Sequence, residues 1–365
     1  MRLLYLCTDA YGGHGGIALF NRQFIEALSC HEDVEEIVVL PRLIVRSLEP
    51  IPVKVRFVAH ASRGRAAYLR ELLTMRRQGG FDLVFCGHVN LLPLSRLVTR
   101  HPVLVIYGID AWRPLRDPLS NRLLRTLGGV VVISELTLDR FLGWSGTTCP
   151  AHLLPPAIHV ERYGIRPKSP DLITRWHLEG RRVLLTLGRI VAAERYKGFD
   201  EVLDVLPQVA EVYPSVTYVA AGDGSDLSRL ARKAAALGVA DRVVFTGMVR
   251  EEEKADLYNL ADVYVMPSRG EGFGLVLLEA MASGVPVIGS RLDGGREALL
   301  GGMLGRLIDP TNPAEIRVAL LDALAEGERK VPEGLDYFSF ARFVERTHAI
   351  VERMRTGTGK GTGTG

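Results

Sequence analysis

Short, continuous apolar runs alternate with stretches of helical periodicity along most of this chain. The first run, LLYLC at 3–7, is followed by a glycine cluster and then by apolar residues at the spacing of a helix face. Further runs lie at 37–40, 81–87 and 103–108. Runs that are apolar throughout are typical of parallel strands that helices bury on both faces. The sequence therefore predicts an α/β architecture of doubly wound parallel sheets.

The series of strands and helices starts again after a polar stretch at 166–171. A chain of 365 residues has room for two domains. We predict one Rossmann-like domain over 1–165 and a second over 166–335, which face one another across a cleft. A last helix is expected over 336–355, where aromatic residues could pack on either domain. The low-complexity residues 356–365 are expected to be disordered.

Composition excludes several other classes of protein. No stretch reaches the ~18 apolar residues of a membrane span, and the start of the chain reads as a strand and its loop, not as a signal peptide. The four cysteines are irregularly spaced, so neither zinc nor redox chemistry is expected. The net charge of +3 is too small to predict a nucleic-acid partner. We expect a cytoplasmic protein with reduced thiols.

Positive charge is concentrated in the first half of the chain. Residues 1–165 carry 19 Lys and Arg against 14 Asp and Glu, whereas residues 166–365 carry 26 against 28. Arginines cluster at 63–77 and at 113–125. Such clusters occur on ordinary solvated helix faces, and they also suit a surface that meets a lipid headgroup or a phosphorylated substrate.

The most informative segment is GEGFGLVLLEAMASG at 270–284. Its first glycines open a helix after a predicted strand, and the free N–H groups of a helix start form an anion site suited to a diphosphate. Glu271 and Glu279 are eight positions apart, or ~12 Å along a helix, too far to hold one atom. They suit opposite ends of an elongated ligand, with a sugar at Glu271 and a ribose at Glu279.

Two further loops carry groups that suit phosphate. Arg189 follows a predicted strand and Lys197 lies eight positions on, so the two cations can clamp a diphosphate and stabilise charge on a departing nucleotide. The loop GGHGG at 12–16 lets the backbone approach an anion closely, although its spacing is not that of a dinucleotide-binding loop. His14 within it is either a ligand contact or an ordinary loop residue.

Together these segments resemble the retaining glycosyltransferases of family 4, the glycosyl transferases group 1, which have the GT-B fold. The resemblance covers nearly the whole chain and is strongest from Leu187 to Asp309, through LGRI, YKGFD, AGDGSD, VVFTGMV, the paired-glutamate string and DGGREAL. It implies an enzyme that moves a hexosyl unit from a UDP- or GDP-sugar to an acceptor hydroxyl with retention. The pathway would be glycan, polysaccharide or glycolipid biosynthesis.

The resemblance also implies roles for single residues. Arg189 and Lys197 would bind the donor diphosphate, Glu271 the transferred sugar and Glu279 the ribose. Other donor contacts are implied in the glycine loops, at the start of the helix and after VVFTG: Gly15, Gly16, Met248, Val249, Gly272, Phe273, Gly274, Leu275, Gly294 and Gly295. The last helix would cross back to the N-terminal domain.

One position departs from the family's pattern. Many members carry a histidine after the fifth strand, where this chain has Tyr107, with Asp110 three positions on. Tyr107 or Asp110 is expected to position the acceptor in its place, the alternative being a packed strand-end tyrosine and a turn aspartate. His14 and His88 are further candidates on the acceptor side.

No DxD string follows a strand where a donor-bound metal would be expected, so we expect no metal and no other cofactor to be required. The acceptor is expected to be a glycan, a lipid-linked sugar or a small molecule. If it is lipid-linked, the basic half would make peripheral contact with the anionic inner face of the membrane. A sugar-nucleotide epimerase of the same fold and a non-catalytic nucleotide-sugar-binding protein are the alternatives.

Overall fold

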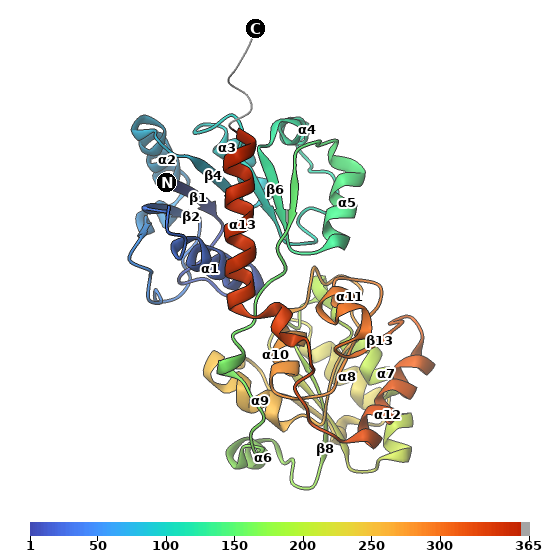
Figure 1. Cartoon of the computed structure of the whole chain (residues 1–365). Coiled ribbons are helices and arrows are strands. Elements are labelled where there is room, and N and C mark those ends of the chain that lie inside the picture. Colours follow the sequence, from blue (N-terminus) through green and yellow to red (C-terminus); the bar gives the residue numbers. More distant parts are fainter. Residues whose placement is uncertain (359–365) are drawn as a thin grey trace. The chain divides into compact units, whose positions relative to one another are not determined.

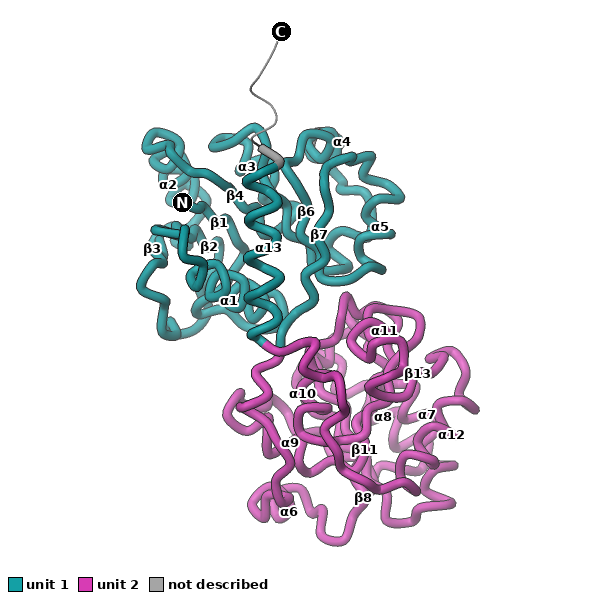
Figure 2. Tube along the Cα trace, viewed as in Figure 1, with its two compact units in different colours: residues 1–157, 340–365 teal, residues 158–339 magenta. Residues whose placement is uncertain are grey.

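The computed structural model describes residues 1–358 and divides into two compact units (Figure 2). Unit 1 comprises Met1–Ala157 together with the chain from Phe340, and unit 2 comprises Ile158–Ser339. The boundaries therefore lie at 157/158 and 339/340, whereas the sequence-based prediction places them at 165/166 and 335/336.

Unit 1 is built on a seven-stranded sheet with the order β3-β2-β1-β4-β5-β6-β7. All of its neighbouring strands run parallel, and those at its centre are almost completely buried, as their apolar sequences predict. The strands are β1 (Arg2–Cys7), β2 (Glu36–Pro41), β3 (Val55–Phe57), β4 (Leu83–Gly87), β5 (Val103–Ile106), β6 (Gly129–Val132) and β7 (Ala151–Leu153).

Helices cover this sheet, and one of them comes from the far end of the chain. They are α1 (Gly16–Ser29), α2 (Arg65–Gln78), α3 (Leu92–Ser95), α4 (Pro118–Leu123), α5 (Glu135–Ser145) and α13 (Phe340–Thr358). In Figure 1, α13 runs beside α1, and the rings of Phe20 and Phe343 meet edge to face at 5.7 Å. Because α13 continues to Thr358, the expected start of the disordered tail at 356 is corrected; residues 359–365 lie outside the described residues.

Unit 2 repeats the architecture with six parallel strands in the order β10-β9-β8-β11-β12-β13. They are β8 (Arg182–Leu187), β9 (Val216–Ala221), β10 (Val243–Phe245), β11 (Val263–Met266), β12 (Val287–Ser290) and β13 (Arg306–Ile308). The prediction of two doubly wound parallel sheets is thus confirmed.

The helices of unit 2 are α6 (Pro170–Trp176), α7 (Phe199–Val212), α8 (Leu227–Ala236), α9 (Lys254–Leu260), α10 (Leu275–Ala282), α11 (Gly295–Ala298) and α12 (Pro313–Glu326). The sequence analysis did not identify α12, which packs against α7. Asn312 is a typical N-cap residue and could have predicted the start of this helix, since its side chain accepts hydrogen bonds from the N–H groups of Ala314 and Glu315. No helix among residues 1–358 is both long enough and apolar enough to cross a membrane.

Candidate active site

In unit 2 the strand order reverses between β8 and β11, which are neighbours although far apart in sequence. The chain leaves β8 toward one side of the sheet and β11 toward the other, which opens a crevice at their carboxyl ends where ligands of such folds bind. The two segments that follow these strands meet there. The N–H of Arg269 donates to the carbonyl of Tyr196 at 2.8 Å, and a side chain at Gly270 would collide with the Tyr196 ring.

Lys197 lies in the segment that follows β8, at the end of a short 3-10 helix, Ala192–Lys197. Its side chain is only 14% exposed, and its ammonium group is paired with the carboxylate of Glu271. Burial alone would lower the pKa of Lys197, but the charge and hydrogen bond of Glu271 outweigh it and raise the pKa. The structure therefore brings together two of the predicted site residues and keeps the lysine charged.

Arg189 directly follows the loop glycine after β8 and is 73% exposed. Its guanidinium group pairs with Glu194, whose other carboxylate oxygen lies 3.8 Å from the Nζ of Lys197. Glu194 therefore links the two cations that the sequence analysis selected.

The turn before α10 is held in place by a buried aspartate that the sequence analysis missed. Asp293 accepts hydrogen bonds from the N–H of Glu271 at 2.9 Å and from that of Gly295 at 3.0 Å, while the N–H of Gly294 donates to the carbonyl of Glu271 at 2.9 Å. Burial raises the pKa of Asp293. Gly274 precedes α10 with φ +99°, a conformation that favours glycine. The turn that leads into α10, where the sequence predicts an anion site, is thus fixed in its conformation by Asp293 and Gly274.

Glu279 lies in the middle of α10 and is 3% exposed. Its carboxylate accepts a 2.6 Å hydrogen bond from the Tyr258 hydroxyl and lies 3.3 Å from the Nζ of Lys254. Burial lowers the pKa of Lys254, but Glu279 and Glu251 outweigh this effect and raise it. The two glutamates of the motif therefore belong to separate clusters, one around Lys197 and one around Lys254.

The remaining predicted donor contacts of unit 2 lie in loops or at the start of α10. Gly272, Phe273 and Leu275 belong to the turn and first residue of that helix, and Gly294 packs directly on this turn. Met248 and Val249 lie between β10 and a 3-10 turn at Glu251–Glu253, and Met248 is largely exposed. Among the described residues, no hydrogen bond joins Met248 or Val249 to Lys197, Glu271 or Glu194.

Unit 1 has its own reversal of strand order, between β1 and β4. His14, Gly15 and Gly16 follow β1, lie exposed and lead into α1. His88 follows β4, and its Nδ1 accepts a hydrogen bond from the N–H of Asn90 at 3.1 Å. Burial lowers the pKa of His88, and the nearby Asp9 partly opposes this effect. The fold therefore gathers the predicted residues of unit 1 at one edge of its sheet.

The Tyr107 hydroxyl lies in the core of unit 1. It donates to the side-chain oxygen of Asn21 at 2.6 Å, and it lies 3.1 Å from both the carbonyl oxygen of Gly87 and the Tyr5 hydroxyl. These bonds tie β1, β4, β5 and α1 together at the carboxyl edge of the sheet. In this arrangement Tyr107 faces structural partners, so any influence on an acceptor would pass through the backbone that follows it.

Asp110 lies in that following turn, where its Oδ1 accepts a 3.3 Å hydrogen bond from the N–H of Tyr107. Its Oδ2 is buried and has no hydrogen-bond partner among the described residues. Burial raises the pKa of Asp110 to about 7, although the N–H groups of Tyr107, Gly108 and Asp110 itself oppose the rise. The turn thus presents a carboxyl group that titrates near neutral pH.

We expect Asp110 to make the stability of unit 1 depend on pH. Because its folded pKa lies above the unfolded value of about 3.9, the folded form binds the proton more tightly, and stability is lost as the pH rises from about 4 to about 7. Relative to the wild type, Asp110→Asn should therefore gain about 2–4 kcal/mol between pH 4 and pH 8. Thermal denaturation across this range measures the difference.

Asp139→Asn on the exposed side of α5 is the matched control, since it removes the same charge. A gain from Asp110→Asn that stayed constant with pH would contradict the assignment.

The comparisons with known proteins bear on both units. A family model described as "Glycosyl transferases group 1" matches residues 181–326, a range that contains the Lys197 cluster, the turn before α10 and Glu279. A GDP-mannose-dependent alpha-(1-6)-phosphatidylinositol monomannoside mannosyltransferase of Mycolicibacterium smegmatis is 34% identical over 257 residues, which cover 67% of this chain and 66% of that relative.

The chain belongs to the group 1 glycosyltransferases.

More distant matches cover more of the chain. A phosphatidyl-myo-inositol mannosyltransferase of Mycobacterium tuberculosis is 27% identical over 340 residues, which cover 90% of this chain and 86% of that one. The structure of Anabaena HepE in complex with UDP and glucose superimposes with a TM-score of 0.74 at 17% identity and covers 97% of this chain and 100% of its own. The group 1 glycosyltransferase described here therefore has the GT-B fold.

Proposed function

We propose that this group 1 glycosyltransferase moves a mannosyl unit from GDP-mannose to an acceptor hydroxyl with retention of configuration. The contact between Lys197 and Glu271, at the start of α10, carries the proposal. It sets a buried cation beside a carboxylate at a helix mouth, which suits a diphosphate next to a sugar. GDP and mannose are the donor parts in the name of the 34% identical relative.

In this mechanism Lys197 and Arg189 stabilise the charge that develops on the diphosphate as its bond to the anomeric carbon breaks. The acceptor oxygen bonds to that carbon from the same face, and its proton passes to the departing phosphate oxygen. Glu271 binds sugar hydroxyls and forms no covalent intermediate, which would need a carboxylate on the opposite face of the sugar. Glu279 binds the ribose, with Lys254 and Tyr258 fixing its orientation.

We propose that the two cations do this work without a metal. Among the described residues, one group has the spacing to hold an ion, His31 with Asp33 and Glu352, and it joins the end of α1 to α13 instead of the crevice. His31 already accepts a hydrogen bond from the N–H of Asp33 and lies 3.2 Å from Glu352. Complete loss of activity in a chelator would contradict a metal-free reaction.

We propose that the acceptor is lipid-linked and that unit 1 binds it. The loop between β2 and β3 and the helix α2 expose apolar side chains among arginines: Leu43, Val45, Leu48, Val53, Leu69 and Leu73. Exposed apolar groups flanked by cations suit the interface of an anionic membrane. Phosphatidylinositol appears in the names of the mannosyltransferase relatives.

Two experiments test the proposal. In a thermal-shift panel of GDP, UDP, ADP and their sugars, GDP and GDP-mannose should raise the melting temperature most, because binding to the folded form alone stabilises it. Sugar release from the donor should then depend on an acceptor; efficient conversion of the donor alone would favour an epimerase, and binding without turnover a non-catalytic protein.

The membrane part has its own test. Co-sedimentation with phosphatidylcholine vesicles should increase when anionic lipid is added, and the Val45→Ser/Leu48→Ser double variant should sediment less. Vesicle binding that did not depend on the anionic lipid content would contradict the proposed membrane contact.

A further inference from the structure

Both cations of the proposed diphosphate site already have carboxylate partners inside unit 2. Glu271 pairs with Lys197, and Glu194 pairs with Arg189 while its second oxygen lies 3.8 Å from Lys197. The two glutamates lie in different segments of unit 2. Glu271 precedes the helix mouth where the sugar is proposed to bind, whereas Glu194 lies within the cation-bearing segment itself and is 11% exposed.

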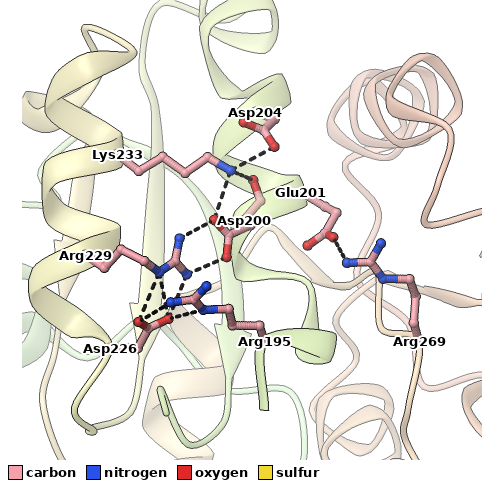
Figure 3. A network of polar contacts seen from close by, with 8 residues as sticks. All are labelled: Arg195, Asp200, Glu201, Asp204, Asp226, Arg229, Lys233 and Arg269. Carbon is pink, nitrogen blue, oxygen red and sulfur yellow. Dashed lines mark hydrogen bonds and ion pairs between the residues drawn. The ribbon is translucent and has the colours of Figure 1, made fainter. Parts of the chain in front are cut away.

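The segment that carries Glu194 is fastened on one side by a network of charges. Arg195 donates two hydrogen bonds, both 3.1 Å, to the carboxylate of Asp226, just before α8 (Figure 3). Asp226 also binds Arg229, which forms a bidentate pair with Asp200 of α7 at 2.7 and 2.6 Å. Arg229 and Arg195 lower the pKa of Asp226 to about 2, so this carboxylate stays charged at any working pH.

On its other side the same segment is tied to the loop after β11. The carbonyl of Tyr196 accepts the hydrogen bond from the N–H of Arg269, and the Arg269 side chain pairs with Glu201 of α7, at the right of Figure 3. A Cβ atom at Gly198 would lie 2.5 Å from the carbonyl oxygen of Pro267, so the backbone at Gly198 packs closely on the residue that follows β11. The two residues that directly follow Glu194 are therefore both anchored, which holds the backbone beside it in place.

We propose that Glu194 is a fixed counter-ion of the diphosphate site, which weakens its hold on the departing nucleoside diphosphate. The inference rests on the proposed function. Because the backbone beside it is anchored, the Glu194 carboxylate stays close to both cations when a second anion arrives, and it offsets about one unit of their positive charge. Lys197 and Arg189 then remain strong enough to stabilise the charge of the transition state, yet release the product.

Replacing Glu194 by a neutral residue should tighten the binding of phosphates. Glu194→Gln keeps the shape of the side chain, and for one charge removed at a few ångströms in a half-buried site we expect GDP and inorganic pyrophosphate to bind about tenfold more tightly. The affinity for GMP should increase less, because a single phosphate group has less negative charge than a diphosphate. The gain should shrink at 1 M salt, where the screening length falls to about 3 Å. Isothermal titration measures all three affinities.

Two further variants separate charge from shape. Glu194→Ser, a second neutral variant, should also tighten GDP binding, whereas Glu194→Asp keeps the charge and should stay within about twofold of the wild type. Asp204→Asn is the matched control, because Asp204 pairs with Lys233 at the outer end of the network and touches neither cation.

The outcomes separate the counter-ion role of Glu194 from the proposed function of the enzyme. If the wild type binds GDP or pyrophosphate but both neutral variants bind them equally or more weakly, the counter-ion assignment is overturned and the proposed function stands. If the wild type binds no nucleoside diphosphate and no pyrophosphate, the proposed function falls, and the counter-ion falls with it.

Discussion

Lys197→Ala is expected to reduce turnover by roughly a thousandfold, because it removes the buried positive charge that faces the leaving diphosphate. Removing one preorganised hydrogen-bond donor that faces a developing negative charge typically costs about 10²–10³ in turnover. The variant also leaves Glu271 and Glu194 without the cation between them, so the site would repel a diphosphate. Steady-state kinetics with GDP-mannose and a lipid-linked acceptor should show the loss mainly in kcat.

Lys330→Ala is the control for this prediction, since the Lys330 side chain is exposed in unit 2 and pairs with Glu333, three residues along the chain. It removes the same charge from the same unit without touching the crevice. Thermal denaturation of both variants checks that unit 2 still folds. If Lys197→Ala kept more than about a tenth of the wild-type turnover, the role of the lysine as the main stabiliser of the departing diphosphate would be refuted.

The architecture could be predicted from the sequence because its signal is local. A run such as 103–106 is apolar at every position, which is typical of a strand that is covered on both faces. Element ends were less predictable. The segment expected to be one helix from 336 is a 3-10 turn, Leu335–Phe338, followed by the extended Ser339 and then α13. The spacing of the apolar residues does not predict this division.

In the site, the sequence identified the groups that follow strands but not their partners. Lys197 and Glu271 are 74 positions apart, and their contact follows from the neighbouring places of β8 and β11 in the sheet. Asp293 and Glu194 were missed for another reason. Asp293 directly precedes Gly294, and Glu194 lies three positions before Lys197. The role of each carboxylate depends on whether it faces a backbone N–H, a cation or water, which only the fold decides.

Tyr107 illustrates the same limit in unit 1. Its position after β5 suggested an acceptor contact, but the side chain of the first residue after a strand can point to either face of the sheet. Here it points toward Asn21 and Tyr5, so its hydroxyl is used within the core. Asp110 remains the predicted group of this turn with a free oxygen atom, and its role in binding the acceptor stays a prediction.

Gly294→Ala should cause the second large effect, because it forces two turns of the donor site apart. A Cβ atom at this position would lie 2.2 Å from the carbonyl oxygen of Gly272 and 2.7 Å from the amide nitrogen of Phe273. Both are backbone atoms, so the turn before α10 has to move, and the hydrogen bond from the N–H of Gly294 to the carbonyl of Glu271 is strained with it. Such overpacking costs about 1–3 kcal/mol of stability.

The loss of activity should be measurable in a protein that still folds. A displacement of about 1 Å in a positioning element can reduce the rate about a hundredfold, and here the element sets both the helix mouth and Glu271. We therefore expect kcat/KM for the donor to fall by about that factor while unit 2 remains folded in urea titrations. Gly143→Ala in α5 is the control, since its Cβ atom would meet nothing within 4 Å and alanine favours a helix. A Gly294→Ala enzyme with kcat/KM within about twofold of the wild type would show that the turn of residues 272–275 does not hold the donor.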